Sequence, residues 1–362
     1  MGMQGTSERA VAAALERGDP LPGTGGFAGE IDGRLVRDVL GRYPLFVEEA
    51  SDGTVADWSD DPSALADPVS FPAGHVRDER GPRRVFSLPD PEPVSDDATA
   101  VTTVRDAVEE SVDAVDTDGL AIAFSGGVDS ALLAARLDAP LYVAGVPDSH
   151  DVEAARSAAD LLDRDLRVVE LTHDTIERAV PDIVAATGRT NAMAVQIALP
   201  LSLTAERVAA DGFDRLAVGQ GADELFGGYA KVAKAPDDPR VEATTVRGAQ
   251  REVVATLPDQ LERDVLALRG AGVEPVAPLL HDRVVDAALR LDDHHLVDGD
   301  TRKWALRQAA RESLPEAIAT RDKKAAQYGS LAARELDRLA RQAGYKRRMD
   351  DHVTQYVESL VE

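Results

Sequence analysis

Six residues near the middle of the chain combine the side chains and the backbone freedom that phosphate binding requires. The segment 125–130 (SGGVDS) follows a short apolar run at 119–124 and precedes a run of good helix formers at 131–137. A glycine turn between a strand and a helix directs backbone N–H groups and the positive helix end at one point, where an anion binds. Ser125 and Ser130 add hydroxyl donors.

The same segment carries a carboxylate and lacks the lysine of a Walker-type P-loop. Gly126 and Gly127 let the backbone approach an anion closely. Asp129 would repel a bare phosphate, so we expect a bridging Mg²⁺. The alternative is a Ser/Gly turn that caps an ordinary helix. The strand–turn–helix context favours a nucleotide phosphate site.

A second glycine cluster, 219–229 (GQGADELFGGY), contains an adjacent acidic pair. As an ordinary loop, its glycines need no ligand. As a site, Asp223 is the second carboxylate on the Mg²⁺ held by Asp129, because a Mg²⁺–triphosphate needs only a few protein oxygens.

The elements around both clusters alternate between strand and helix patterns. We expect strands at 119–124, 140–146, 166–171 and 215–219, and helices at 102–116, 151–162, 175–187 and 192–210. Strands separated by helices predict an α/β fold with a doubly wound parallel sheet, whose ligand lies at the carboxyl ends of the strands. From about residue 246 the chain is expected to be mostly helical.

The first quarter of the chain has a different pattern. After a helix at 10–15 and a Pro/Gly breaker at 20–26, short apolar pieces alternate with turns over 27–90. Residues 88–98 are rich in proline and acid and read as a linker. We therefore divide the chain into a small β-rich domain with its linker at 1–95 and an α/β domain at 96–362.

The composition restricts the class of protein. The net charge is −25, only six lysines occur, and the basic residues are mainly arginine, as in proteins of salt-accumulating halophilic archaea. Such a charge argues against a nucleic-acid ligand. No cysteine is present, which removes disulfides, thiolate metal sites and cysteine nucleophiles. No stretch approaches a membrane span or a signal pattern, so we expect a cytoplasmic protein without a membrane partner.

Six segments over about residues 100–335 resemble the synthetase domain of asparagine synthetases, relatives of the β-lactam synthetases and of other ATP pyrophosphatases. They are the 125–130 loop, the 219–229 cluster, 143–151 (VAGVPDSHD), 275–282 (PVAPLLHD), and the pair 303–307 (KWALR) with 321–330 (RDKKAAQYGS). The resemblance implies an adenine nucleotide α-hydrolase-like sheet, a helical C-terminal part, and the substrates ATP, aspartate and ammonia.

The resemblance also implies a mechanism. The β-carboxylate of aspartate attacks the α-phosphorus of ATP, pyrophosphate leaves, and ammonia displaces AMP from β-aspartyl-AMP. The residues implied in nucleotide binding are Ser125, Gly126, Gly127, Asp129, Ser130, Val146, Gly219 and Gly221, with Asp129 and Asp223 on Mg²⁺. Lys323, or Lys324 beside it, would stabilise the charge on the phosphates; otherwise Lys323 forms a surface ion pair.

One position departs from the family pattern. Gln220 stands where asparagine synthetases typically carry a glutamate that handles the proton of the attacking amine. An amide only donates and accepts hydrogen bonds at neutral pH. Glu224 is a candidate base, although a structural role in the loop is an equal expectation. A ligase of the same chemistry with another carboxylate or amine therefore stays open.

The N-terminal region resembles, more weakly, the later part of the glutaminase domain that precedes such synthetases. That domain uses a terminal cysteine, whereas position 2 is Gly2 here. We therefore expect no use of glutamine by this chain alone, with ammonia supplied from solution or by a separate glutaminase docked on residues 1–90.

Two other classes of protein are disfavoured by the residues present. The missing cysteines and the acidic composition argue against an adenylating tRNA-modification enzyme. A non-catalytic partner protein would be expected to have lost the metal carboxylates, yet both Asp129 and Asp223 are present. The oligomeric state is left open.

Overall fold

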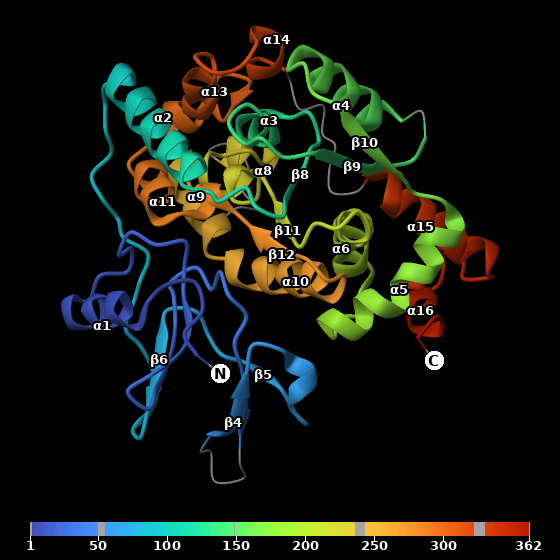
Figure 1. Cartoon of the computed structure of the whole chain (residues 1–362), viewed down its shortest axis with the longest axis horizontal. Coiled ribbons are helices and arrows are strands. Elements are labelled where there is room, and N and C mark those ends of the chain that lie inside the picture. Colours follow the sequence, from blue (N-terminus) through green and yellow to red (C-terminus); the bar gives the residue numbers. More distant parts are fainter. Residues whose placement is uncertain (1, 50–54, 148, 236–242, 322–329, 362) are drawn as a thin grey trace. The chain divides into compact units, whose positions relative to one another are not determined.

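The chain forms two compact units, each assembled from separate stretches of sequence (Figure 1). The computed structural model describes residues 2–49, 55–147, 149–235, 243–321 and 330–361. Unit 1 comprises Met1–Val115, Gly219–Glu262 and Ala277–Glu312, and unit 2 comprises Asp116–Val218, Arg263–Val276 and Ser313–Glu362. The domain division between residues 95 and 96 stays a prediction.

Unit 2 is built on the expected parallel sheet. Its five strands are β8 (Leu120–Ala123), β9 (Leu141–Gly145), β10 (Leu166–Glu170), β11 (Arg215–Ala217) and β12 (Glu274–Val276). They lie in the order β10-β9-β8-β11-β12, and every neighbouring pair is parallel. The chain proceeds from β8 to one edge and then returns to the other side of β8. The strand order therefore reverses beside β8, which is where a doubly wound sheet binds its ligand.

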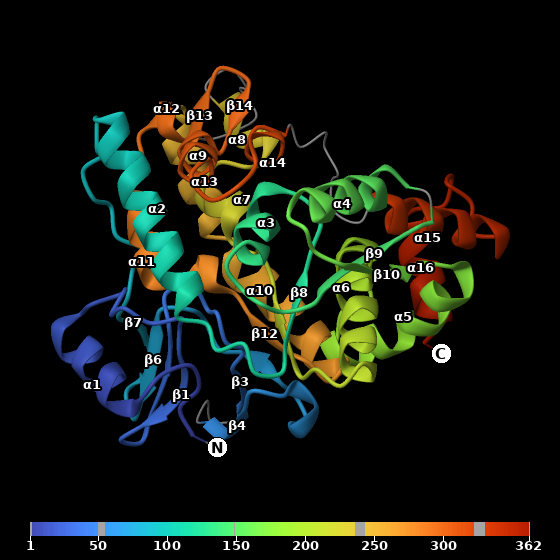
Figure 2. The same cartoon turned by 45° about the horizontal axis from the view of Figure 1, so that its top comes forward.

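Helices cover both faces of this sheet. In Figures 1 and 2, α4 (His150–Leu161) and α6 (Ala192–Ala210) lie on opposite sides of β9 and β10. The short helix α3 (Val128–Ala134) follows β8 directly and contacts α14 (Glu316–Ala319). This layering confirms the predicted fold class and places the 125–130 segment at the carboxyl end of the central strand.

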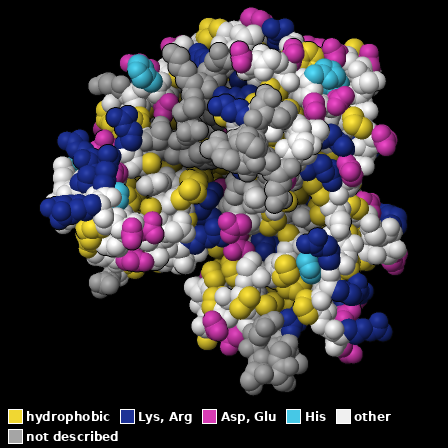
Figure 3. Space-filling view, turned by 180° about the vertical axis from the view of Figure 1, so that it is seen from behind, with side chains coloured by type: hydrophobic (Ala, Val, Ile, Leu, Met, Phe, Trp, Pro, Cys, Tyr) yellow, Lys and Arg dark blue, Asp and Glu magenta, His cyan; other side chains and the backbone are white. Residues whose placement is uncertain are grey.

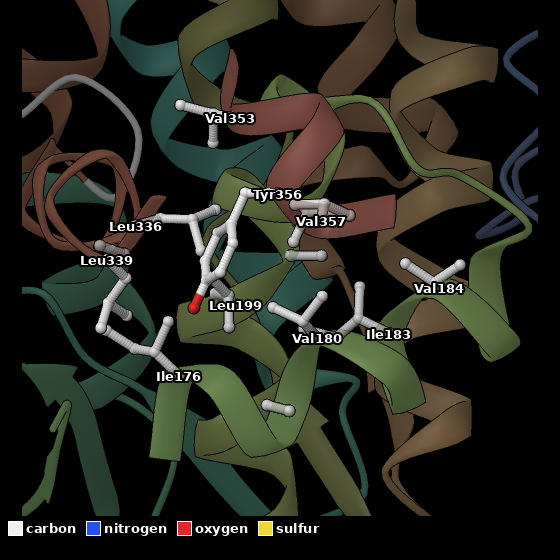
Figure 4. Close-up of a cluster of buried hydrophobic side chains, with 14 of the residues drawn as sticks. Ile176, Val180, Ile183, Val184, Leu199, Leu336, Leu339, Val353, Tyr356 and Val357 are labelled. Atoms are coloured by element: carbon white, nitrogen blue, oxygen red, sulfur yellow. The ribbon is translucent and has the colours of Figure 1, made fainter. Parts of the chain in front are cut away.

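A large apolar core joins the C-terminal helices of unit 2 (Figure 4). It lies between α6, α5 (His173–Thr187), α15 (Ser330–Gln342) and α16 (His352–Ser359). Its α5 members follow helical spacing, and α15 and α16 contribute further buried side chains: Ile176, Val180, Ile183 and Val184, then Leu336, Leu339, Val353 and Val357. None of the described helices combines the length and the apolar character that a bilayer crossing requires.

The strand β12 was not expected from the sequence. Its three residues include Pro275, and the surrounding segment carries no alternating pattern. Proline cannot donate a ladder hydrogen bond, so it is tolerated at the edge of a sheet, where β12 lies.

Unit 1 begins with the expected β-rich region. The helix α1 (Glu8–Arg17) is followed by two antiparallel sheets. One sheet has the order β1-β2-β6-β7, from β1 (Ala28–Ile31), β2 (Arg34–Arg37), β6 (His75–Asp78) and β7 (Gly81–Arg84). The other has the order β4-β3-β5, from β3 (Phe46–Glu49), β4 (Val55–Ser59) and β5 (Val69–Ser70). A 3₁₀ helix, η1 (Pro62–Ala64), precedes β5. Asp32 and Gly33 both adopt left-handed backbone angles in the β1–β2 turn, which suits the twist of a hairpin.

Helices complete unit 1. They are α2 (Asp97–Asp113), α7 (Ala222–Leu225), α8 (Ala230–Lys234), α9 (Val246–Val254), α11 (Asp282–Leu289), α12 (Asp293–Leu296) and α13 (Trp304–Ala310). The hairpin of β13 (Val297–Asp298) and β14 (Thr301–Arg302) precedes α13, and η3 (Pro278–Leu280) precedes α11. The helix α2 packs against α11 and α13 (Figure 2). The helix α10 (Leu257–Gly270) contributes residues to both units.

Buried ion pairs join the β-rich region to the later segments of unit 1. Arg42 lies within 2.9 Å of Asp38 and 2.8 Å of Asp282, and all three side chains are at most 3% exposed. Asp282 also accepts the backbone N–H of Thr24 at 2.7 Å. Charges at this depth are tolerated only when each is paired, so these contacts specify how the two segments meet.

Part of the expected linker at 88–98 is held by hydrogen bonds, whereas its last two residues belong to α2 and not to a linker. Arg247 and Arg251 of α9 donate to the carbonyl oxygens of Pro91 and Pro89 at 2.6 and 2.8 Å. Val94 forms a parallel bridge with Leu291. Proline lacks a backbone N–H and so cannot continue a helix or a central strand. Its carbonyl oxygen can still accept a hydrogen bond, and these bonds fix the segment against α9.

Candidate active site

The 125–130 loop of unit 2 turns back on itself at the end of β8. The backbone N–H of Ser125 donates to the Ser130 hydroxyl at 3.2 Å, and that hydroxyl lies 3.3 Å from the Gly127 carbonyl oxygen. Ser130 is buried, whereas Ser125 is exposed. Ser130 therefore holds the shape of the loop, and Ser125 presents its side chain at the surface of the unit.

The turn requires glycine at its second position. Gly126 has a φ of 73°, a left-handed conformation that favours glycine. A Cβ there would lie 2.8 Å from the carbonyl oxygen of Ala154 and 2.9 Å from the Cα of Ala155, both in α4. Gly127 is the N-cap residue of α3, and no side chain caps this end of the helix. The first backbone N–H groups of α3 are therefore not occupied by a capping side chain.

Asp129 and Val146 are the other predicted site residues of unit 2. Asp129 lies in the first turn of α3, and Val146 follows β9 and packs against the apolar core of the unit. The start of α3 and the residue after β9 thus lie at the carboxyl ends of neighbouring strands. Both positions agree with the strand-end location that a doubly wound sheet uses for ligands.

The second glycine cluster belongs to unit 1, where it forms α7 and the turn after it. Gly221 begins α7 with a φ of 93°, and a Cβ there would overlap the Leu280 side chain. Gly219 and Gln220 precede it and are half-buried. Asp223, in the first turn of α7, forms an ion pair with Lys303, whose Nζ lies 2.8 Å from Asp223 Oδ1.

This ion pair is the main feature of the site that the sequence did not reveal. The Lys303 side chain is only 3% exposed, and its backbone adopts a left-handed φ of 58°. A Cβ on Gly228 would overlap Asp223 Oδ1 and lie 2.5 Å from Lys303 Cε, so Gly228 makes room for the pair. The motif at 303–307 had pointed to Lys303 without giving its role, because its partner lies 80 positions earlier.

Two further contacts hold the turn after α7. The Tyr229 hydroxyl donates to Glu224, which is 5% exposed. Gln250 of α9 donates to the Leu225 carbonyl oxygen at 2.6 Å. Glu224 is thus hydrogen-bonded within its own loop, and its role in the reaction stays a prediction.

The residues proposed for Mg²⁺ fit that ion by donor type. Asp129 and Asp223 supply carboxylate oxygens, which are the hard ligands that Mg²⁺ prefers. Asp223 already carries the Lys303 ammonium on one oxygen, which reduces the negative charge that it offers to a cation. Lys323 and Lys324, expected to contact the phosphates, lie outside the described residues.

Comparison with known proteins agrees with the resemblance. The asparagine synthase family matches residues 103–252 and 233–359, more than half of the chain. A putative asparagine synthetase (glutamine-hydrolyzing) of Methanocaldococcus jannaschii is 29% identical over 281 residues, covering 67% of this chain and 52% of that protein. Asparagine synthetase B (glutamine-hydrolyzing) of Escherichia coli is 27% identical over 342 residues, covering 84% and 61%.

An asparagine synthetase (glutamine-hydrolyzing) of Arabidopsis thaliana is 26% identical over 321 residues, covering 80% of this chain and 54% of that protein. The chain thus spans between about half and three-fifths of the length of these relatives. The family match and the parallel sheet lead to the same conclusion. The chain belongs to the asparagine synthase family.

Proposed function

We propose that this protein is an ATP-dependent ligase that forms asparagine from aspartate and ammonia, releasing AMP and pyrophosphate. The observation that carries the proposal is the 125–130 loop, which follows the central parallel strand and begins α3 with an uncapped glycine. Backbone N–H groups at such a position bind phosphate oxygens. Membership of the asparagine synthase family supplies the expected reaction class.

In the proposed first step, the β-carboxylate of aspartate attacks the α-phosphorus of ATP and pyrophosphate leaves, which gives β-aspartyl-AMP. Ser125, Gly127 and Ser130 bind the departing pyrophosphate through hydroxyl and backbone N–H groups. Gly126 allows the close backbone approach, and Val146, Gly219 and Gly221 contact the rest of the nucleotide. Asp129 and Asp223 hold Mg²⁺, which when bound neutralises charge on the phosphates. Lys323 adds a positive charge at the same phosphates.

In the proposed second step, ammonia displaces AMP from the activated carboxyl group, and the proton that the amine loses passes to water or to pyrophosphate. Gln220 accepts a hydrogen bond from the incoming amine and so orients it, since an amide cannot take its proton. Glu224 stabilises the loop that carries Gln220 and Asp223, in keeping with its bond to Tyr229. We propose ammonia as the nitrogen donor, from solution or from a separate glutaminase, because these 362 residues contain no cysteine.

Product analysis tests the reaction class. The full chain is incubated with ATP, Mg²⁺, aspartate and ammonium chloride in concentrated KCl, and phosphorus NMR follows the products. We expect AMP and pyrophosphate in step with asparagine; ADP and inorganic phosphate would contradict the proposal. Replacing aspartate by other carboxylates, and ammonium by glutamine, shows whether the acceptor and the nitrogen donor are assigned correctly.

A pair of variants tests the role of the loop carboxylate in the same assay. Asp129→Asn should lower turnover by about 100-fold or more, the usual cost of one preorganised electrostatic group, while the circular dichroism spectrum is unchanged. Asp138→Asn is the matched control, because Asp138 is exposed beyond the other end of α3. Equal turnover in the two variants would remove Asp129 from the mechanism.

A further inference from the structure

We propose that Asp97, His294 and His295 of unit 1 bind a divalent transition-metal ion, with Zn²⁺ as the representative ligand. Asp97 is the first residue of α2, and the two histidines lie in α12. The Nε2 atoms of His294 and His295 lie 3.0 and 3.1 Å from the same oxygen, Oδ1 of Asp97. Segments almost 200 residues apart thus direct three metal-ligating atoms at one point.

The spacing of these atoms suits a small metal ion. One ligand atom from each residue can be chosen so that all three lie within 4.8 Å of one another. Ligand atoms about 2.1 Å from a tetrahedral Zn²⁺ are separated from each other by about 3.4 Å. The two nitrogen–oxygen distances here are slightly shorter, so a small outward movement of the exposed residues would admit the ion. Two imidazoles and one carboxylate also form a common zinc donor set that leaves a fourth position for water.

Part of the proposed metal site is fixed by packing before any metal binds. The His295 side chain is fully buried, and its ring lies 3.8 Å from the His294 ring, measured between centroids. The buried ring of His295 is therefore already in place before a metal binds.

The surroundings of the cluster are negatively charged. His294 Nδ1 lies 4.0 Å from Asp292 Oδ2, which is too far for a hydrogen bond but close enough for the carboxylate to attract a cation bound at His294. Asp96 lies close enough to His295 for the two to interact electrostatically. The negative charges of Asp292 and Asp96 both favour the binding of a cation at the cluster.

Hydrogen bonding within the cluster sets the cost of binding. The backbone N–H of Asp292 donates to His295 Nδ1 at 3.4 Å, which places the ring proton on Nε2. Metal binding through Nε2 moves that proton to Nδ1 and breaks this long bond. The loss is small because a hydrogen bond at 3.4 Å is weak. Without a metal, the cluster would serve only to connect α2 with α12.

The fluorescence of Trp304 can report metal binding directly, because its ring lies beside both histidines. Its ring lies 5.8 Å from the His295 ring and 6.4 Å from the His294 ring, between centroids. Only one other tryptophan, Trp58, is present, so a Trp58→Phe background assigns the emission to Trp304. Trp304 also follows Lys303, so the same signal reports on the segment that contacts Asp223.

The test uses the full chain after chelator treatment, in about 1 M KCl so that non-specific attraction to the acidic surface is screened. Zn²⁺ binding is measured by calorimetry, Co²⁺ binding by visible absorption, and both by Trp304 emission. We expect one ion per chain, a Co²⁺ spectrum of nitrogen and oxygen ligation, and at least a 10-fold weaker affinity in His294→Ala and in Asp97→Asn.

His150→Ala is the matched control, because His150 is fully exposed at the start of α4 in unit 2. It should bind as the parent does. His294 is nearly half exposed, so its removal should leave the fold intact, as circular dichroism can verify. The proposal is overturned by the absence of stoichiometric binding, by unchanged affinity in His294→Ala and Asp97→Asn, or by equal weakening in His150→Ala. None of these readouts depends on ligase activity.

Discussion

At the scale of single residues, the ion pair between Lys303 and Asp223 stabilises α7 and the turn that follows it in unit 1. The buried ammonium neutralises part of a carboxylate that is 22% exposed, and Gly228 leaves the space for the contact. Arg302, the preceding residue, donates to the Gly228 carbonyl oxygen at 2.6 Å. Two consecutive basic residues therefore hold the position of the same turn.

Replacing Lys303 by methionine keeps most of its volume and removes its charge. Breaking a buried ion pair by removing one partner leaves an uncompensated charge, so the free energy of unfolding should fall by about 3 kcal/mol. Urea unfolding measures this. Lys346→Met, an exposed lysine between α15 and α16, is the control and should change stability little. Equal stability of the two variants would show that Asp223 does not depend on Lys303.

At the scale of elements, the C-terminal helices of unit 2 are joined by polar contacts beside the apolar core of Figure 4. Asp337 of α15 accepts hydrogen bonds from Arg347 at 2.8 Å and from His352 of α16 at 2.9 Å, and it pairs with Arg341 at 3.1 Å. The hydrogen bond from Arg347 is the main cause that lowers the pKa of Asp337 far below its ordinary value.

Because the folded state lowers the pKa of Asp337, the carboxylate stabilises the fold above its unfolded value of 3.8, and this contribution is lost as the pH falls toward the folded value. Asp337→Asn should lower the free energy of unfolding by about 2 kcal/mol at neutral pH and reduce its dependence on pH below about 4. Unfolding in urea over a pH series checks both. Asp350→Asn, an exposed aspartate in the same connection, should retain the parent's pH dependence.

At the scale of the whole molecule, the main feature is the net charge of −25 on 362 residues. Figure 3 shows Asp and Glu side chains at many separate places on one face. Like charges on a folded surface repel one another, and salt screens this repulsion. We therefore propose that the protein is adapted to a salt-rich solvent.

Thermal unfolding in increasing KCl tests this proposal. Raising KCl from about 0.1 M to about 2 M shortens the screening length several-fold. The midpoint of unfolding should then rise by about 5 °C, which corresponds to roughly 4 kcal/mol for a chain of this size. A non-ionic solute at the same osmolality should give a much smaller rise. A midpoint that falls or stays constant in KCl would refute the adaptation.

The sequence by itself determined the features that depend on neighbouring residues. The apolar run at 120–123, the glycine turn and the helix formers after it predicted β8, the loop and α3, because each conformation follows from local propensity and spacing. The alternation of strands and helices predicted the parallel sheet for the same reason. The motifs at 125–130 and 219–229 were sufficient to indicate the family.

Only the tertiary structure decided which distant residues meet. The strand β12 forms because β11 offers it an open edge, and its own three residues carry no pattern that predicts a strand. The pairing of Lys303 with Asp223, and of Asp97 with His294 and His295, joins segments separated by 80 or more positions. Burial and ion pairing across such distances depend on the whole packed chain, so no local pattern of residue types contains them.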